Sequence, residues 1–287
     1  KFGDDLQTDV TIPPAAKRVH FTPVKRVHFI RHGEGHHNVA QREWRASKDY
    51  VEGTEPYTID TDVDYKYLDA ELTDKGTRQA KQLQDYVSRN CNHTQLLIVS
   101  PLRRATQTGL HAFEQVAVPR VVALEAAHER AGRHTCDKRL SKTELQKLFG
   151  DRVDYELIED EEDPFFWELG AKGDMRGRVR ESPRSMTLRA VDLLKFIMEC
   201  PETEIAVAAH SALLQAVFTC VLQGSDIGAT WFGTGEIRSC DLTFLEAKAC
   251  SKGYGRRRGW IMALGLAVVA TAVPKVLSLT NSMRQKN

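Results

Sequence analysis

Residues 27–38 read VHFIRHGEGHHN, an apolar run that stops abruptly at the polar residues around His32. The run predicts a buried strand over 24–30, because a short stretch of β-branched and aromatic residues suits a strand inside a sheet. Two later apolar runs also end in polar residues, SPLRR at 100–104 and His210 with its neighbour. In an open parallel sheet, ligands bind at the carboxyl ends of the strands. The three endings therefore predict one polar site at one edge of a sheet.

Outward from this stretch, short apolar runs alternate with helical patterns along the chain. The expected strands are 24–30, 96–99, 120–124, 205–209 and 237–245, and the expected helices are 74–89, 103–116, 183–199 and 211–222. Alternation of this kind predicts an α/β fold, a three-layer α/β/α sandwich with a mostly parallel central sheet. The stretches 40–70 and 125–182 break the alternation and are long enough to be functional insertions.

The charge of the chain is unevenly distributed. Lys and Arg number 40 and Asp and Glu number 39, a net charge of +1. From residue 251 onward there are seven basic and no acidic residues, so residues 1–250 carry 33 basic and 39 acidic ones, about −6. A mildly acidic body without a basic stripe argues against nucleic-acid binding.

The six cysteines show neither a CxxC pair nor the spacing of zinc ligands. In segments that are predicted to be buried, a thiol acts as a small apolar residue rather than as half of a disulfide. A reducing compartment is then the default, and we expect the catalytic domain to lie in the cytoplasm. The cysteines are Cys91, Cys136, Cys200, Cys220, Cys240 and Cys250.

Two histidines and several arginines are expected to converge at the predicted polar edge. Because each strand end leads into a helix, backbone N–H groups and positive helix ends would point to the same place. The planar guanidinium of arginine donates two parallel hydrogen bonds to phosphate oxygens and stays charged. The residues therefore predict a site for a phosphoryl group.

The three blocks that carry these residues resemble the signature blocks of the histidine phosphatase superfamily. The blocks are VHFIRHGEGHHN at 27–38, SPLRRATQT at 100–108 and AVAAHSALLQ at 206–215. A fourth stretch, HERAGRHTCDKR at 128–139, is similar to phosphoglycerate-mutase-like proteins of plant and fungal type. The resemblance covers residues 25–246 and implies the phosphoglycerate-mutase-like form of the sandwich.

The resemblance implies a role for each matched residue. His32 would attack phosphorus and form a phosphohistidine. Arg31, Arg104 and His210 would hold the phosphoryl oxygens and stabilise the charge that builds on them. Asn38 matches an asparagine near the phosphate in the family. For His32 to attack, one ring nitrogen must be unprotonated while a backbone carbonyl holds the other.

The leaving oxygen needs a proton, and Glu129 matches the acid of the family best. Glu125, His128 and Asp137 lie near enough in the sequence to remain alternatives. Nearby cations could line the mouth of the site and attract an acidic substrate. These cations are Arg133, His134, Lys138 and Arg139.

No cofactor and no metal are implied, because the chain has no Walker loop, no HExxH and no carboxylate cluster that suits Mg²⁺. True cofactor-dependent mutases carry Ser and Trp where this chain has Gly35 and His37. The expected activity is therefore that of a phosphatase, a phosphomonoesterase that acts on a phosphorylated small molecule or a phosphoprotein. The alternatives are phosphoglycerate-mutase-type phosphoryl transfer and a catalytically weak scaffold that binds phosphorylated ligands.

Three segments are expected along the chain: an extended lead-in at 1–24, the catalytic domain at 25–248 and a basic, apolar tail at 249–287. The run at 260–279 reaches the length of a bilayer span if Lys275 snorkels, and basic residues lie on both sides of it. We expect this run to be a membrane anchor facing the cytosol, the alternatives being a docked helix and an interfacial helix. Oligomeric state and substrate are not readable from the sequence.

Overall fold

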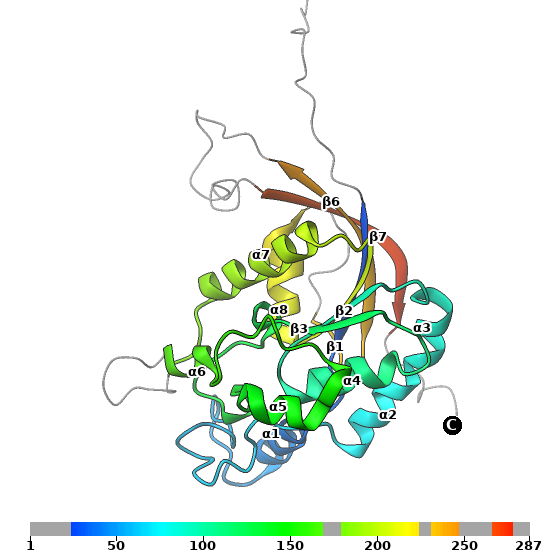
Figure 1. Ribbon diagram of the computed structural model, residues 1–287. Helices are drawn as coiled ribbons and strands as arrows, with labels where there is room; N and C mark the ends of the chain where they lie inside the picture. The colour runs from blue at the N-terminus through cyan, green and yellow to red at the C-terminus, as the bar shows by residue number, and fades with distance from the viewer. Residues whose placement is uncertain (1–23, 169–178, 224–230, 247–265, 278–287) are drawn as a thin grey trace, which may run out of the picture.

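The computed structural model describes residues 24–168, 179–223, 231–246 and 266–277 (Figure 1). Seven strands form one sheet in the order β3-β2-β4-β1-β6-β7-β5. The strands are β1 (Lys25–Arg31), β2 (Leu96–Val99), β3 (Arg120–Ala123), β4 (Glu204–Ala209), β5 (Leu222–Gln223), β6 (Ile237–Glu246) and β7 (Leu266–Leu277). The expected strand over 24–30 is β1, and it lies near the centre of the sheet.

The sheet is mostly parallel, as expected. β1, β2, β3 and β4 all run in the same direction, since β4 pairs in parallel with β1 and β2, and β2 pairs in parallel with β3. β6 is antiparallel to β1, and β7 is antiparallel to β6. The parallel half brings the ends of β1, β2 and β4 to one edge, where Arg31 stands beside Ala209.

Helices cover both faces of the sheet, which confirms the three layers. They are α1 (His36–Ala46), α2 (Asp74–Gln82), α3 (Gln84–Asn90), α4 (Arg103–Ala112), α5 (Lys142–Phe149), α6 (Pro164–Glu168), α7 (Pro183–Glu199) and α8 (Ser211–Ala216). The single helix expected over 74–89 is divided into α2 and α3 at Leu83, whose N–H bonds to the carbonyl of Ala80 in a tight turn.

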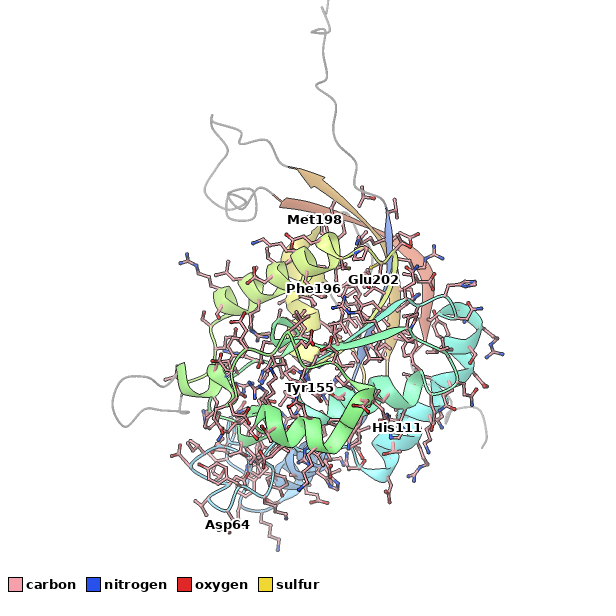
Figure 2. All side chains as sticks on the ribbon, viewed as in Figure 1. Asp64, His111, Tyr155, Phe196, Met198 and Glu202 are labelled. Carbon is pink, nitrogen blue, oxygen red and sulfur yellow. The ribbon has the colours of Figure 1, made fainter. Side chains whose placement is uncertain are left out.

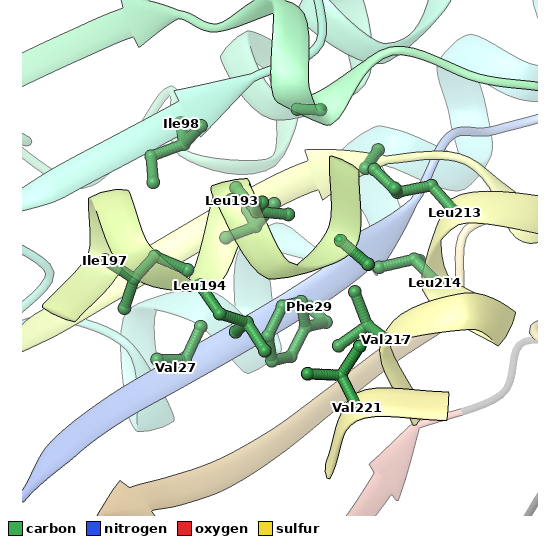
Figure 3. Packing of buried hydrophobic residues seen from close by; sticks show 14 of the residues in the cluster. Val27, Phe29, Ile98, Leu193, Leu194, Ile197, Leu213, Leu214, Val217 and Val221 are labelled. Atoms are coloured by element: carbon green, nitrogen blue, oxygen red, sulfur yellow. The ribbon is translucent and has the colours of Figure 1, made fainter. Parts of the chain in front are cut away.

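Alternate residues of β1, β2 and β4 enter two separate cores. Val27 and Phe29 of β1 pack with Leu194 of α7 and Leu214 of α8 in the first core, which Figure 3 shows. Ile30, on the opposite side of the strand, belongs to the second core, under α3, α4 and α5. This period of two is what a strand buried on both faces requires, and it explains why β2 and nearly all of β4 are apolar.

The side chains around the molecule follow the same division (Figure 2). Phe196 and Met198, on α7, pack against the first core. Tyr155, on the segment after α5, is part of the second. The sheet therefore separates two apolar layers, and the polar site must lie at an edge of the sheet.

The two insertions are bound to each other. The N–H of Thr135 donates to the carbonyl of Tyr57 at 2.8 Å, and the N–H of Ile59 donates to the carbonyl of Arg133 at 2.9 Å. An isolated bridge joins Thr58 to His134. The segments 57–59 and 133–135 thus join the two insertions beside the carboxyl ends of the strands.

The prediction of a membrane helix over 260–279 is wrong for the residues described there. Residues Leu266–Leu277 are strand β7, which pairs with β6 from Glu246↔Leu266 to Ile237↔Leu277. A run rich in Val and Ala suits a strand, and Pro274 falls where the register shifts, a position that needs no ladder N–H. Across the described ranges, no helix has the length and apolar character needed to cross a bilayer.

The sheet thus continues past residue 248, where we expected the catalytic domain to end. The segment at 1–23 and the residues flanking β7 at 247–265 and 278–287 lie outside the described residues.

Candidate active site

The three predicted strand endings meet in the structure. The N–H of His32, just after β1, donates to the carbonyl of Ala209 at the end of β4 at 3.0 Å. The N–H of Gly33 donates to the hydroxyl oxygen of Thr108 in α4, also at 3.0 Å. The rings of His32 and His210 lie 5.0 Å apart between centroids. His32 and His210 therefore lie side by side at the edge of the parallel sheet, as the sequence predicts.

The ring of His32 is held in one tautomer. Its Nδ1 lies 2.6 Å from the carbonyl oxygen of Gly33, which accepts and so fixes the proton on Nδ1. Burial, with 2% of the residue exposed, lowers the pKa of His32 well below its usual value, and the guanidinium groups of Arg104 and Arg31 lower it further. His32 is therefore a neutral imidazole with an unprotonated Nε2, the form in which histidine is a nucleophile.

We predict that His32, His37 and His210 keep neutral rings in the ligand-free protein between pH 8 and pH 6. Burial lowers the pKa of each well below 6.5, and the charge of Arg104 lowers it further. In the unfolded chain these rings titrate near 6.5, so they take up protons first and reduce the free energy of unfolding as pH falls below that value. Proton and carbon chemical shifts of the ring Cε1–H groups check this. A midpoint above pH 6 for any of the three would contradict it.

Arg104 rather than Arg103 faces the site, as the sequence comparison implies. Arg104 is 1% exposed, and its Nη2 donates to Oδ1 of Asp137 at 2.7 Å. Arg103 turns away and pairs with Glu71 at 3.0 Å. Burial alone would lower the pKa of Arg104, but the carboxylate of Asp137 raises it overall, so this buried guanidinium stays charged.

The carboxylate of Asp137 forms ion pairs with two arginines. Its Oδ1 accepts from Arg104, and its Oδ2 accepts from Nη1 of Arg180 at 2.8 Å. Burial would raise the pKa of Asp137, yet the partners His134, Arg180 and Arg104 hold it well below its usual value. A carboxylate that is ionised and doubly paired cannot donate a proton to a leaving group. Asp137 is thus a positioning residue, and Arg180 is a site residue that sequence reasoning missed.

Glu129 differs from the other candidate acids in its contacts. Glu125 pairs with Arg139 at 2.7 Å, and His128 lies 3.2 Å from Asp163. Glu129 is 8% exposed, and within the described ranges its carboxylate takes part in no ion pair.

The carboxylate of Glu129 is placed by weak contacts at the start of α8. Oε1 accepts from the N–H of Arg130 at 2.8 Å, while Oε2 lies 3.4 Å from the Ser211 hydroxyl and from the N–H of Ala212. These two residues directly follow His210 in the sequence. The carboxylate of Glu129 therefore lies at the start of α8, next to His210.

Asn38 lies in the site region but does not point freely into the site. Its Oδ1 accepts from the N–H of Gly35 at 2.9 Å, and its Nδ2 lies 2.9 Å from Nε2 of His37. The side chain therefore caps α1 and orients the neighbouring ring. A direct contact between Asn38 and phosphate remains a prediction.

The loop after β1 is fixed by a close approach of backbones. A Cβ on Gly76, in the first turn of α2, would lie 2.1 Å from the carbonyl oxygen of Glu34. A Cβ on Gly33 would lie 2.5 Å from the carbonyl oxygen of Gly76. Thr73, the N-cap of α2, also donates its N–H to Glu34 at 2.9 Å. Helix α2 thus presses directly on the segment that carries His32.

We expect Gly76→Ala to lower the free energy of unfolding by about 3 kcal/mol, because the new methyl group meets a backbone that must move. Gly109→Ala in α4 is the matched control: its Cβ would lie 3.2 Å from the side chains of Ala208 and Val99, which can shift by a few tenths of an ångström. Alanine gains helix propensity at either position. Urea unfolding of both variants checks this, and equal midpoints would refute the close approach.

In the described part of the chain, one cluster brings together three side chains of kinds that can bind a metal ion: His134, Cys136 and Asp137. It does not fit a cation. Both carboxylate oxygens of Asp137 already accept from arginines, and burial raises the pKa of the Cys136 thiol well above its usual value. Two guanidinium charges at this place would repel a metal ion.

The basic loop that was expected at the mouth of the site is largely engaged elsewhere. Arg139 is buried, and its guanidinium donates to the carbonyls of Asp160, Glu161 and Glu162. The segment at 160–162 is therefore held by its backbone carbonyls, and Arg139, which also pairs with Glu125, cannot attract a substrate. Arg133 lies 3.8 Å from Glu55 and keeps 38% of its side chain exposed.

Residues 61–252 match the sequence profile of the histidine phosphatase superfamily (branch 1). The matched range begins after the first block, so the placement of Arg31 and His32 rests on the geometry above.

A phosphoglycerate mutase-like protein of Arabidopsis thaliana is 29% identical over 224 residues, 68% of this chain and 74% of that protein. A protein of the fungus Arthroderma benhamiae named "Probable phosphoglycerate mutase" is 25% identical over 202 residues, 67% of this chain and 56% of that protein. A solved mycobacterial glucosyl-3-phosphoglycerate phosphatase is 16% identical, with a TM-score of 0.42, covering 76% of this chain and 91% of that one. At that level nothing about activity follows from the structural likeness.

Proposed function

Because this chain belongs to the histidine phosphatase superfamily, we propose that it is a phosphomonoesterase that works through a phosphohistidine on His32. The observation that carries the proposal is the state of the ring: neutral, with Nδ1 held by Gly33 and Nε2 unprotonated. Superfamily membership alone leaves both phosphatases and mutases open. The neutral nucleophile beside charged arginines and the carboxyl group of Glu129 supports phosphoryl transfer to His32, and Gly35 and His37 in place of the Ser and Trp of the mutases favour water as the acceptor.

In the first step, the Nε2 lone pair of His32 forms a bond to phosphorus while the bond from phosphorus to the ester oxygen breaks. The ester oxygen takes a proton from the carboxyl group of Glu129 and leaves as an alcohol. In the second step, water attacks phosphorus, gives a proton back to Glu129, and the N–P bond breaks to release phosphate. Splitting the reaction in this way replaces one difficult displacement with two easier ones.

The cations around the ring stabilise the phosphoryl group in both steps. Arg31 and Arg104 carry the charge, and Arg104 is held in place by Asp137. His210 is positioned by a 2.7 Å contact between its Nε2 and the Ser100 hydroxyl, which leaves Nδ1 for the phosphoryl oxygens. Preorganised donors of this kind act on the charge that develops in the transition state.

A second candidate is transfer of the phosphoryl group to another substrate, as in a mutase. The names of the curated relatives favour it. The same phosphohistidine would form, but an alcohol rather than water would receive the phosphoryl group.

The test is phosphate release from 4-nitrophenyl phosphate by the full chain. We expect turnover without added metal, and a ³²P label on histidine after rapid acid-free quenching. Release of phosphate with ¹⁸O from labelled water supports hydrolysis. A label that passes to an added phosphoglycerate without phosphate release would favour the mutase. A folded protein that neither releases phosphate nor becomes labelled would refute both.

A further inference from the structure

His37 lies inside the proposed phosphoryl site. It is the second residue of α1 and is 7% exposed. Its ring centroid is 5.7 Å from that of His32 and 5.9 Å from that of Tyr57, with an edge-on approach to the tyrosine. A histidine buried this close to the nucleophile either takes part in binding or must find its own hydrogen-bond partners.

The contacts of Asn38 decide which nitrogen of His37 carries the proton. Because Oδ1 of Asn38 accepts from the N–H of Gly35, its Nδ2 is the atom that faces His37 Nε2. An amide nitrogen can only donate, so Nε2 of His37 accepts. Burial lowers the pKa of His37 well below its usual value, and Arg104 lowers it further, so the ring is neutral and its single proton sits on Nδ1.

That Nδ1–H has no acceptor within the described part of the chain. Three other buried nitrogens share this state, namely Nε of Arg31, Nε of Arg104 and Nδ1 of His210. All four groups surround His32: the two arginines lower its pKa, and the two histidine rings lie within 6 Å of its own. Buried donors without acceptors are costly and rare in folded proteins, and three of them around one point, on His37, Arg31 and Arg104, indicate a missing acceptor.

Gly35 makes room for this ring. A Cβ at Gly35 would lie 2.8 Å from both Cε1 and Nδ1 of His37. The two positions at which the first block departs from the Ser and Trp of the mutases are therefore in contact, and each depends on the other. A serine at position 35 would collide with the ring, so the glycine and the histidine form one unit.

We propose that His37 is a fourth donor to the phosphoryl group, its Nδ1–H donating to a non-bridging oxygen of the bound substrate. The proposal rests on the phosphomonoesterase function above. The two arginines supply charge, whereas His37 supplies a neutral hydrogen bond from a fixed direction. Such a donor strengthens as charge builds on the phosphoryl oxygens, without adding a further cation to a site that already holds two.

The test compares three substitutions in the full chain by calorimetric titration with orthovanadate and with orthophosphate. His37→Phe keeps a ring of similar size and removes both nitrogens. His37→Gln places an amide where Nε2 lies, while His37→Asn places an amide N–H where Nδ1 lies. We expect the Phe and Gln variants to bind orthovanadate about 10- to 100-fold more weakly, and the Asn variant to stay within about 3-fold of the wild type.

A folded Phe variant that binds orthovanadate as tightly as the wild type would overturn the proposal. So would an Asn variant that is as weak as the Phe variant, because the ring and not the donor would then matter. Thermal midpoints show which variants are folded, and the Gln and Asn pair remains informative if Phe does not fold.

The two proposals fail in different ways. A wild type that binds orthovanadate but hydrolyses no aryl phosphate would contradict the phosphomonoesterase function, and the orthovanadate affinities of the His37 variants could still be compared. A wild type that hydrolyses the ester, with all three variants binding orthovanadate as tightly as the wild type, would contradict only the role of His37. A wild type that binds neither anion would overturn both.

Discussion

Replacing His32 by alanine is expected to lower kcat for an aryl phosphate by about 10⁴- to 10⁶-fold, the scale seen when an enzyme loses its nucleophile. The residual rate would come from the donors that remain on Arg31, Arg104 and His210. Orthophosphate binding should survive, since those donors are untouched. The measurement is steady-state release of 4-nitrophenol together with the ³²P label on histidine, which should disappear completely.

His36→Ala is the matched control for this experiment. His36 begins α1 only four residues away, but it is exposed, so its loss should leave kcat unchanged within about 2-fold. If His32→Ala retained more than a hundredth of the wild-type kcat while His36→Ala did not, the nucleophile would be assigned to the wrong residue.

Glu129→Gln is expected to lower kcat/KM, which covers only phosphoryl transfer to His32 and departure of the alcohol, by about 10²- to 10⁴-fold for an alkyl phosphate, because the alkoxide then has to leave without a proton. Glutamine keeps the size of the side chain and its contacts with Arg130 and Ser211. For 4-nitrophenyl phosphate the loss should be much smaller, since nitrophenolate is stable without protonation. The readout is therefore the ratio of the two losses, which a general disturbance of the site would not change.

Glu52→Gln provides the control for removing a carboxylate. Glu52 is exposed on the insertion at 40–70, and its replacement should leave the rates with both esters unchanged. Equal losses for the two esters in Glu129→Gln would rule out general acid catalysis by this residue. Asp137 would not replace it, because its carboxylate is held ionised by Arg104 and Arg180.

Much of the fold could be predicted because its signals are local. The apolar run of β1 has the period of a strand buried on both faces, and Val27, Phe29 and Ile30 indeed enter the two cores. The N-cap at Thr73 and the proline that opens α7 are also local signals, and the structure uses both. The convergence of His32 and His210 could be predicted because the edge of a parallel sheet places strand ends together.

What could not be predicted depends on long-range contacts. Nothing near Asp137 in the sequence reveals that it binds Arg104 and Arg180, since these residues come from separate segments. The burial of Arg139 among the carbonyls of 160–162 is likewise invisible in a basic loop. For Leu266–Leu277, composition alone fits a membrane segment and a buried strand equally well, and only pairing with β6 decides between them.

The position of β1 in the sheet affects how the protein is made. β1 is the first strand of the sheet to leave the ribosome, yet both of its neighbours, β4 and β6, belong to the last third of the chain. At about 5–20 residues per second, the nascent strand waits roughly 10–40 s with both edges unpaired. An apolar strand in that state is prone to pair with other chains, so newly synthesised molecules should depend on chaperones until β6 emerges.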